Sequence, residues 1–207
     1  PYSLEQMAKD ALAVLDAEGV TSAHIIGASM GGVIAQIMGV MHPERTRSLV
    51  LACTSCRHHP WRREVLQEWA DAVQERGIER GSAGLNDEAL RWLVGPRLRR
   101  RFGVWLNILA RILVHADPDG FAGQVHAILD APDELRFELC NVRVPALVIT
   151  GSQDALTPIG DAEELAEMIP GARLRELRGA AHGLMVEQPN AYNSAVLEFL
   201  REVELAR

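Results

Sequence analysis

The stretch GASMGG, residues 27–32, joins two apolar runs and sets glycines on both sides of one serine, Ser29. The run before it, AHIIGA at residues 23–28, lacks alternation, which is typical of a strand buried on both faces. The run after it, residues 31–43, is apolar nearly all round and predicts a central helix that stops at Pro43. A passage from buried strand through a tight turn into a buried helix favours an α/β fold.

Further strands and helices continue this alternation on both sides of a long central stretch. A second buried strand is predicted at residues 47–53, a third at 144–151, and a weaker, edge-like one at 172–177. Helices are predicted from Ser3, a plausible N-cap, to the region of Gly19, and at residues 158–168 and 189–203. Strands that alternate with helices predict a mostly parallel sheet flanked by helices.

The central stretch, residues 54–142, has a different hydrophobic pattern. It contains no run typical of a buried strand, and helices are predicted near residues 61–73, 86–94, 97–114 and 119–130. We therefore expect a helical lid at residues 54–142, inserted into a core made of residues 1–53 and 143–207.

Composition narrows the classes of function. The chain has 207 residues, 48% of them apolar and 24% charged, with a net charge of −7, which is typical of a soluble globular protein and argues against general binding to nucleic acid or anionic membranes. No apolar run approaches the ~18 residues of a membrane span, and no leader segment is visible, so a cytoplasmic location is expected. The three cysteines, Cys53, Cys56 and Cys140, are expected to be reduced thiols, although Cys53 and Cys56 form a C-x-x-C pattern typical of redox or metal sites.

The turn around Ser29 suits a nucleophile. A serine hydroxyl needs a base within hydrogen-bond reach and donors for the oxyanion that forms when it attacks an acyl carbon. A sharp strand-to-helix turn lifts Ser29 out of the sheet, and Gly27 and Gly31 are expected to leave room for that turn. The backbone N–H of Met30 then points at the developing charge as an oxyanion-hole donor. The alternative is a glycine-rich turn with an idle serine.

These residues resemble the nucleophile elbow, G-x-S-x-G, of the α/β-hydrolase superfamily. The family places an acid after a later strand and a histidine after the next one. Asp154, in LVITGSQDALTP, and His182, in LRGAAHGLMVEQP, occupy these places in that order. The resemblance implies a triad in which Ser29 attacks, His182 moves the proton and Asp154 orients the imidazole, with no cofactor and no metal.

A finer resemblance concerns the substrate. Residues 117–151 are similar to 3-oxoadipate enol-lactonases and related small esterases, and a serine nucleophile disfavours the haloalkane dehalogenase and epoxide hydrolase branches. The implied activity is hydrolysis of a small carboxylic ester, lactone or thioester through an acyl-enzyme. The alternative is a non-catalytic fragment of this fold that binds a ligand or partner.

The chain departs from the family at its front. It starts at Pro1, one helix before the elbow, whereas family members have several strands there and a His-Gly loop that supplies a second oxyanion donor. It resembles the carboxyl-terminal two-thirds of such an enzyme, so we expect a fragment, a misassigned start or part of a longer chain. The strand at residues 23–28 is then expected to expose an edge and an apolar face, which favours oligomers or self-association.

The remaining histidines and an arginine-rich run give weaker indications of a functional site. His24 lies within a predicted strand and His42 precedes a proline, while four further histidines fall in the predicted lid: His58, His59, His115 and His126. None forms an H-x-x-x-H or H-E-x-x-H pattern, so no metal site is predicted. The run RLRRR at residues 97–101 is expected to be a solvated helix face, although attraction of an anionic substrate is the alternative.

Overall fold

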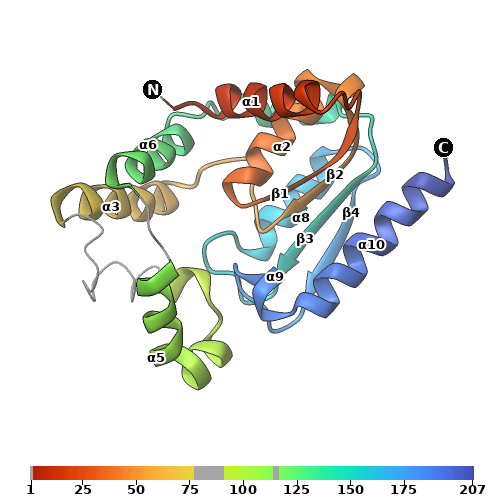
Figure 1. Cartoon of the computed structure of the whole chain (residues 1–207). Helices are drawn as coiled ribbons and strands as arrows, with labels where there is room; N and C mark the ends of the chain where they lie inside the picture. The colour runs from red at the N-terminus through yellow and green to blue at the C-terminus, as the bar shows by residue number, and fades with distance from the viewer. Residues whose placement is uncertain (1, 77–90, 114–116) are drawn as a thin grey trace.

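A computed structural model describes residues 2–76, 91–113 and 117–207, with only the backbone described for residues 106–113. The described residues form a parallel sheet in the order β1–β2–β3–β4, which confirms the predicted α/β class (Figure 1). The strands span β1 (Ala23–Ala28), β2 (Thr46–Ala52), β3 (Ala146–Gly151) and β4 (Arg173–Leu177). The strand predicted as edge-like, β4, lies at one edge of the sheet.

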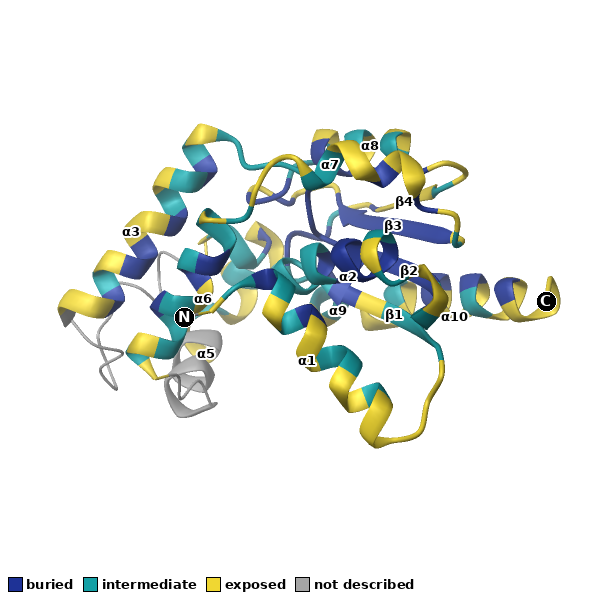
Figure 2. Ribbon diagram, turned by 90° about the horizontal axis from the view of Figure 1, so that it is seen from above, coloured by how far each residue is buried: buried dark blue, intermediate teal, exposed yellow. Residues whose placement is uncertain are grey.

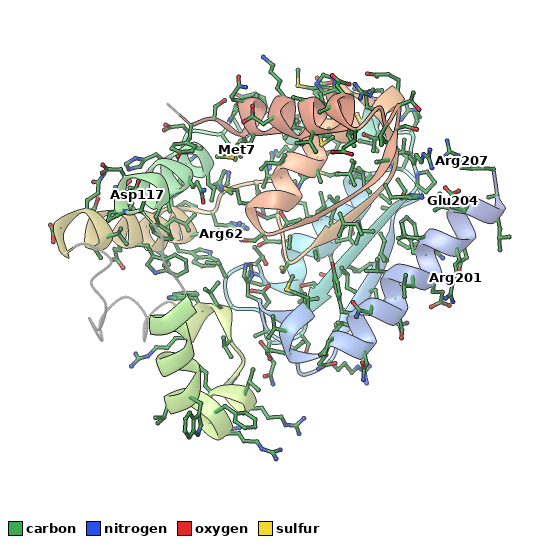
Figure 3. The ribbon with its side chains drawn as sticks, viewed as in Figure 1. Met7, Arg62, Asp117, Arg201, Glu204 and Arg207 are labelled. Atoms are coloured by element: carbon green, nitrogen blue, oxygen red, sulfur yellow. The ribbon has the colours of Figure 1, made fainter. Side chains whose placement is uncertain are left out.

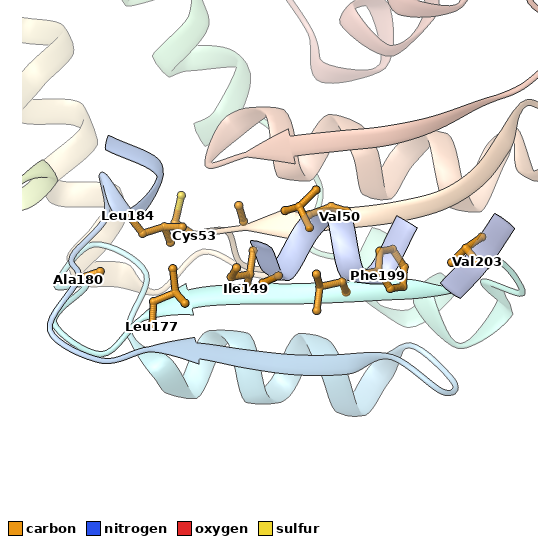
Figure 4. Close-up of a cluster of buried hydrophobic side chains, with 12 residues drawn as sticks. Val50, Cys53, Ile149, Leu177, Ala180, Leu184, Phe199 and Val203 are labelled. Carbon is orange, nitrogen blue, oxygen red and sulfur yellow. The ribbon is translucent and has the colours of Figure 1, made fainter. Parts of the chain in front are cut away.

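Apolar clusters hold helices against both faces of the sheet. On one face, Val50, Ile149 and Leu177 pack against α9 (Leu184–Glu187) and α10 (Pro189–Leu205), as Figure 4 shows. On the other face, the buried residues of β2 and β3 pack against α2 (Met30–Met41) and α8 (Ile159–Met168). Burial therefore makes β2 and β3 the centre of the core (Figure 2), since β2 and β3 lie between other strands and helices cover both of their sides.

The first helix covers α2 rather than the sheet. It is α1 (Leu4–Ala17), and Leu4 and Ala8 pack against Ile37 and Met38 of α2. Its start is set by Ser3, whose hydroxyl accepts a hydrogen bond from the backbone N–H of Gln6 at 3.1 Å, as the sequence predicts for an N-cap. The first helix therefore packs on the outer side of α2.

The stretch between β2 and β3 is helical in its described part. It contains α3 (Pro60–Arg76), α5 (Pro96–Leu113), α6 (Pro118–Leu129) and a single turn, α7 (Leu135–Glu138), while short 3₁₀ turns occur at Pro43–Arg45 and Leu139–Asn141. Helices α3 and α6 pack together and share a cluster that includes Leu66, Val125 and Leu156. The helix predicted at 86–94 lies mostly outside the described residues, although 91–93 are helical. The division into a core and a lid stays a prediction.

Strand β1 differs from the prediction of burial on both faces. Ile26 is 49% exposed, and most of the strand is only half-buried. Ile26 is the register partner of Val50 and points to the same face of the sheet, but the cluster that α9 and α10 form with Val50 does not extend to Ile26 at the sheet edge. Its end near α10 is covered, because His24 makes hydrogen bonds with Ser48 at 2.7 Å and with Glu204 at 2.9 Å (Glu204 is labelled in Figure 3). The open edge and the exposed Ile26 agree with the expectation that this strand exposes an edge and an apolar face, and self-association through them stays a prediction.

Candidate active site

Ser29 sits in a strained turn between β1 and α2. Its φ of 53° lies in the left-handed region that non-glycine residues rarely adopt. Three hydrogen bonds hold it there: its N–H donates to the Ala52 carbonyl at 2.9 Å, and its carbonyl accepts from Gly32 N–H at 2.9 Å and from Thr54 Oγ1 at 2.8 Å. The hydroxyl is thus fixed at the carboxyl end of the sheet, which is the geometry expected of a nucleophile elbow.

Only one of the two glycines predicted to make room for the turn does so in the described structure. A Cβ on Gly27 would lie 2.0 Å from the Gly31 carbonyl oxygen, so no side chain fits there. A Cβ on Gly31 would meet nothing within 4 Å among the described residues, so the predicted steric role of Gly31 is wrong. The tight position is instead Gly32, where a Cβ would lie 2.5 Å from Thr54 Cβ.

The structure brings Ser29, His182 and Asp154 together. The Ser29 hydroxyl lies 2.9 Å from His182 Nε2, and His182 Nδ1 lies 2.9 Å from Asp154 Oδ2. His182 and Asp154 are only 5% and 6% exposed. Each of the three follows a different strand, and because parallel strands end at the same edge, residues far apart in sequence meet there. This chain of hydrogen bonds can pass the serine proton to an imidazole held by a carboxylate.

Asp154 is held by its own loop. Its Oδ1 accepts the backbone N–H groups of Leu156 and Thr157, both at 2.9 Å, and its Oδ2 accepts the Thr157 hydroxyl at 2.7 Å. These bonds leave Oδ2 aimed at His182 and stabilise the ionised carboxylate. Sequence reasoning missed Thr157, although an aspartate whose side chain accepts N–H groups two and three residues ahead is a common turn signal before a proline such as Pro158.

Met30 is the first residue of α2, as predicted. In the described part of the chain, no backbone carbonyl outside the helix accepts its N–H. A helix begins with N–H groups that lack intrahelical partners and carry partial positive charge. The Met30 N–H is thus free to stabilise an oxyanion formed at Ser29, and its role as a donor stays a prediction.

Two of the thiols, Cys53 and Cys56, lie in surroundings that favour the protonated form. Cys53 directly follows β2, and burial raises the pKa of its thiol to about 12, with the Asp154 carboxylate adding to the rise and the backbone N–H of Ser29 opposing it. Burial likewise raises the pKa of Cys56 to about 12, with Glu164 acting in the same direction. All three cysteines are free. Because the thiolate is the nucleophile and the ligand, neutral Cys53 and Cys56 are poorly suited to redox or metal chemistry.

A buried ion pair fastens α3 to the site, and sequence reasoning missed it. Arg62, labelled at the sheet-facing end of α3 in Figure 3, is 3% exposed and pairs with Asp161 of α8, which is 4% exposed. Arg62 also donates to the Leu156 carbonyl at 2.7 Å, two residues beyond Asp154. Burial raises the pKa of Asp161, and Arg62 and His59 oppose that rise. The tip of the acid loop is thereby tied to the helical stretch.

A small cavity adjoins the serine. Ser29, Met30 and Arg62 line it together with His58, which stands on the loop between β2 and α3. Burial lowers the pKa of His58 to about 4; Arg63 strengthens this effect, Asp133 opposes it and Arg62 adds a smaller decrease. His58 is therefore neutral near pH 7. The sequence placed His58 in the predicted lid and gave it no role.

The other predicted features that the structure describes do not line this cavity. The arginines of the run at residues 97–101 are mostly exposed on α5, as expected of a solvated face. His115 lies outside the described residues. Among the residues that the structure describes, no three His, Cys, Asp or Glu side chains are grouped to hold a metal ion. None of the described helices has the length and apolar character needed to cross a membrane.

Comparison with known proteins places this geometry in context. A sequence model described as the alpha/beta hydrolase family matches residues 1–195. The chain is 31% identical over 196 residues to 3-oxoadipate enol-lactonase 2 of Acinetobacter baylyi, covering 95% of this chain and 70% of that protein. It is 28% identical over 209 residues to the pimeloyl-[acyl-carrier protein] methyl ester esterase of Chromobacterium violaceum, covering 96% and 78%. The crystal structure of the enol-lactonase from Burkholderia xenovorans LB400 superposes with a TM-score of 0.86 at 33% identity, covering 97% of this chain and 74% of that one.

Proposed function

This chain belongs to the alpha/beta hydrolase family, and from that premise we propose that it hydrolyses a small carboxylic ester, lactone or thioester with Ser29 as its nucleophile. The observation that carries the proposal is the pair of 2.9 Å hydrogen bonds that joins Ser29 Oγ to His182 and His182 to Asp154. The strained φ of 53° at Ser29 supports it, because such strain persists only where the surrounding structure imposes it.

The proposed reaction has two halves. In the first, Ser29 Oγ attacks the acyl carbon while His182 Nε2 takes the hydroxyl proton, and the oxyanion faces the Met30 N–H. The intermediate collapses, the bond to the leaving group breaks, and His182 returns the proton to the leaving oxygen or sulfur. In the second half, water attacks the acyl-serine, gives its proton to His182, and releases the carboxylic acid while Ser29 regains its proton. No electrons are exchanged with any other reagent.

Asp154 has a fixed task in this scheme. Its Oδ2 accepts the His182 Nδ1 proton, which leaves Nε2 unprotonated and facing Ser29. When His182 becomes cationic, the buried carboxylate stabilises the charge at short range. An activated serine attacks acyl carbons in general, and the lactonase and esterase names of the relatives support esters and lactones as the substrate class.

A fluorophosphonate probe tests the proposal directly. It should label the wild type at Ser29, Ser29→Ala should abolish labelling, and the same substitution should remove turnover of p-nitrophenyl butyrate. Ser194→Ala is the matched control, because Ser194 is exposed on α10 and should leave both readouts unchanged. Labelling that survives in Ser29→Ala, or wild-type protein that neither labels nor turns over the ester, would refute the assignment. The second result would favour a non-catalytic binding module.

A further inference from the structure

The cavity beside Ser29 is best assigned to the acyl part of the substrate. His182 protonates the leaving group, so the leaving group must lie on the side of Ser29 that faces His182. The lining residues include Ser29 and Met30, whereas His182 is not among them. The cavity is bounded by α2, by the segment from Thr54 to Leu66 and by the acid loop, and because the His182 ring does not line it we assign it to the acyl group that stays attached to Ser29. Its volume of about 40 Å³ is room for roughly two or three water-sized groups, which suits a short acyl chain.

Most of the cavity wall is apolar, and nearly all of its polar atoms already have partners. Met30, Val33, Leu66, Ile128 and Leu156 supply the apolar surface. Thr54 Oγ1 donates to the Ser29 carbonyl at 2.8 Å, and Thr157 Oγ1 donates to Asp154 at 2.7 Å. Ser55 Oγ donates to the Arg57 carbonyl at 3.1 Å. These three hydroxyls are occupied in holding the site together.

The guanidinium of Arg62 also has hydrogen-bond partners already. Its Nε donates to the Leu156 carbonyl, its Nη1 donates to Ser55 Oγ at 2.7 Å and to the Arg57 carbonyl at 2.9 Å, and its Nη2 donates to Asp161. These contacts use four of the five N–H groups of a guanidinium, and the Asp161 carboxylate balances its charge. An acyl chain that carries a carboxylate would have to compete with Asp161 for Arg62. The cavity is thus poorly suited to an anion.

His58 is the exception among these polar groups. In the described part of the chain neither ring nitrogen of His58 makes a hydrogen bond. Its Nδ1 is shielded from solvent, so Nε2 is the ring nitrogen that a ligand can reach. Burial lowers its pKa to about 4, so near neutral pH the ring is uncharged and offers one donor and one acceptor. Because His58 lines a mostly apolar cavity and its Nε2 has no partner, a ligand that hydrogen-bonds Nε2 is favoured over one that does not.

We propose that His58 is a specificity-determining residue that hydrogen-bonds an uncharged oxygen function, a hydroxyl or keto group, on a short acyl chain held in the cavity beside Ser29. This inference rests on the proposed function, since it assumes acyl transfer to Ser29. It narrows the substrate class to esters, lactones or thioesters of short hydroxy or keto acids and disfavours acyl chains that end in a carboxylate.

Three p-nitrophenyl esters of similar chain length test the inference: butyrate, 3-hydroxybutyrate and monosuccinate. Wild-type kcat/KM should favour 3-hydroxybutyrate over butyrate by about tenfold, the value of one good hydrogen bond, and monosuccinate should be the poorest. In His58→Leu the preference for 3-hydroxybutyrate should fall to near one, and His58→Gln, which keeps a donor and an acceptor, should restore part of it. His42→Leu is the matched control, because His42 caps the far end of α2, and it should keep the wild-type preference.

Each outcome separates this inference from the function on which it rests. Turnover of butyrate with no preference for 3-hydroxybutyrate, or a preference that survives in His58→Leu, overturns the role of His58 and leaves the serine hydrolase intact. Monosuccinate as the best ester overturns it too and points to Arg62 as an anion site. Absence of turnover on all three esters overturns the proposed function and the inference together.

Discussion

Two buried carboxylates close together in sequence, Asp154 and Asp161, differ in the region of the molecule that supplies their partners. The loops at the strand ends supply those of Asp154, and the helical stretch between β2 and β3 supplies those of Asp161. Asp154 and Asp161 are 6% and 4% exposed. Asp154 is bound by two N–H groups and a hydroxyl of its own loop, and it reaches His182 at the neighbouring strand end. Asp161 is bound by Arg62 and His59, which belong to α3 and the loop before it. Asp154 completes the proposed triad, whereas Asp161 joins the helical stretch to the core.

The difference teaches that burial alone does not identify a functional acid. Asp154 is held by partners from its own loop, so its carboxylate can be positioned to within a small tolerance. Asp161 has distant partners whose main effect is to neutralise a buried charge. Substitution of each acid by its isosteric amide should therefore change different measured quantities.

The largest effect is expected for Asp154→Asn. The amide cannot accept the Nδ1 proton of His182 in the same way, so His182 is no longer held with an unprotonated Nε2 facing Ser29. We expect kcat for p-nitrophenyl butyrate to fall by about 10³–10⁴-fold. Urea unfolding of the same variant provides the control for folding. A decrease in kcat of less than tenfold in a folded variant would contradict the role given to Asp154.

Asp161→Asn should act mainly on stability. It leaves the Arg62 guanidinium buried without its counter-charge, which typically costs about 3–5 kcal/mol in the free energy of unfolding. Urea titration followed by circular dichroism measures this loss. Glu163→Gln, an exposed position on the same helix, is the matched control and should change stability by less than about 0.5 kcal/mol.

The double variant Arg62→Met with Asp161→Asn sharpens the test. Removing the buried cation together with its partner should recover much of the stability lost in Asp161→Asn, because replacing both charges is often nearly neutral. If Asp161→Asn is as stable as the wild type, the pair does not hold the helical stretch to the core. The distinction between the two acids would then fail.

The contrast between local and distant partners also explains which parts of the structure the sequence predicts. Ser29, Asp154 and His182 each follow a strand within a recognisable local pattern, and parallel strands end together, so their meeting could be expected. The β-strands and most helices were likewise set by local apolar patterns. For β1 the apolar run predicts burial on both faces, whereas the comparison with the family's order of elements predicts an open edge and an exposed apolar face, and the exposure of Ile26 agrees with the second expectation.

The missed residues depend on distant packing. Arg62 and Asp161 are 99 residues apart in sequence, and nothing near either residue indicates that the other is its partner. His58 acquires its neutral state from burial and from Arg63, Asp133 and Arg62, which surround it only after folding. A charge or a histidine within a predicted helical stretch gives no local signal of such surroundings. Thr157 is an intermediate case, because the aspartate and the following proline form a local turn pattern that is consistent with its position.

A smaller effect should separate the two glycines around Ser29. Gly27→Ala puts a Cβ 2.0 Å from the Gly31 carbonyl oxygen, so the turn must shift, and we expect a loss of about 2–3 kcal/mol in the free energy of unfolding. Gly31→Ala meets nothing within 4 Å among the described residues and should be neutral or stabilising by up to about 1 kcal/mol in a helix. Thermal and urea unfolding measure both. Equal losses in the two variants would show that the turn is limited by something other than this contact.

The smallest expected effect concerns His58 and tests whether the helical stretch keeps that ring buried and neutral. Its pKa is about 4 in the folded protein, against the ordinary value of 6.5. The unfolded chain therefore binds a proton between these values while the folded protein does not, so the stability from neutral His58 is complete above pH 6.5 and is lost as pH falls toward 4. Between about pH 7 and about pH 4.5 the wild type should lose about 2 kcal/mol more than His58→Leu, which cannot take up the proton. Urea titrations of both proteins at the two pH values measure the difference, and parallel losses would mean that the ring is open to water and cannot select an acyl chain.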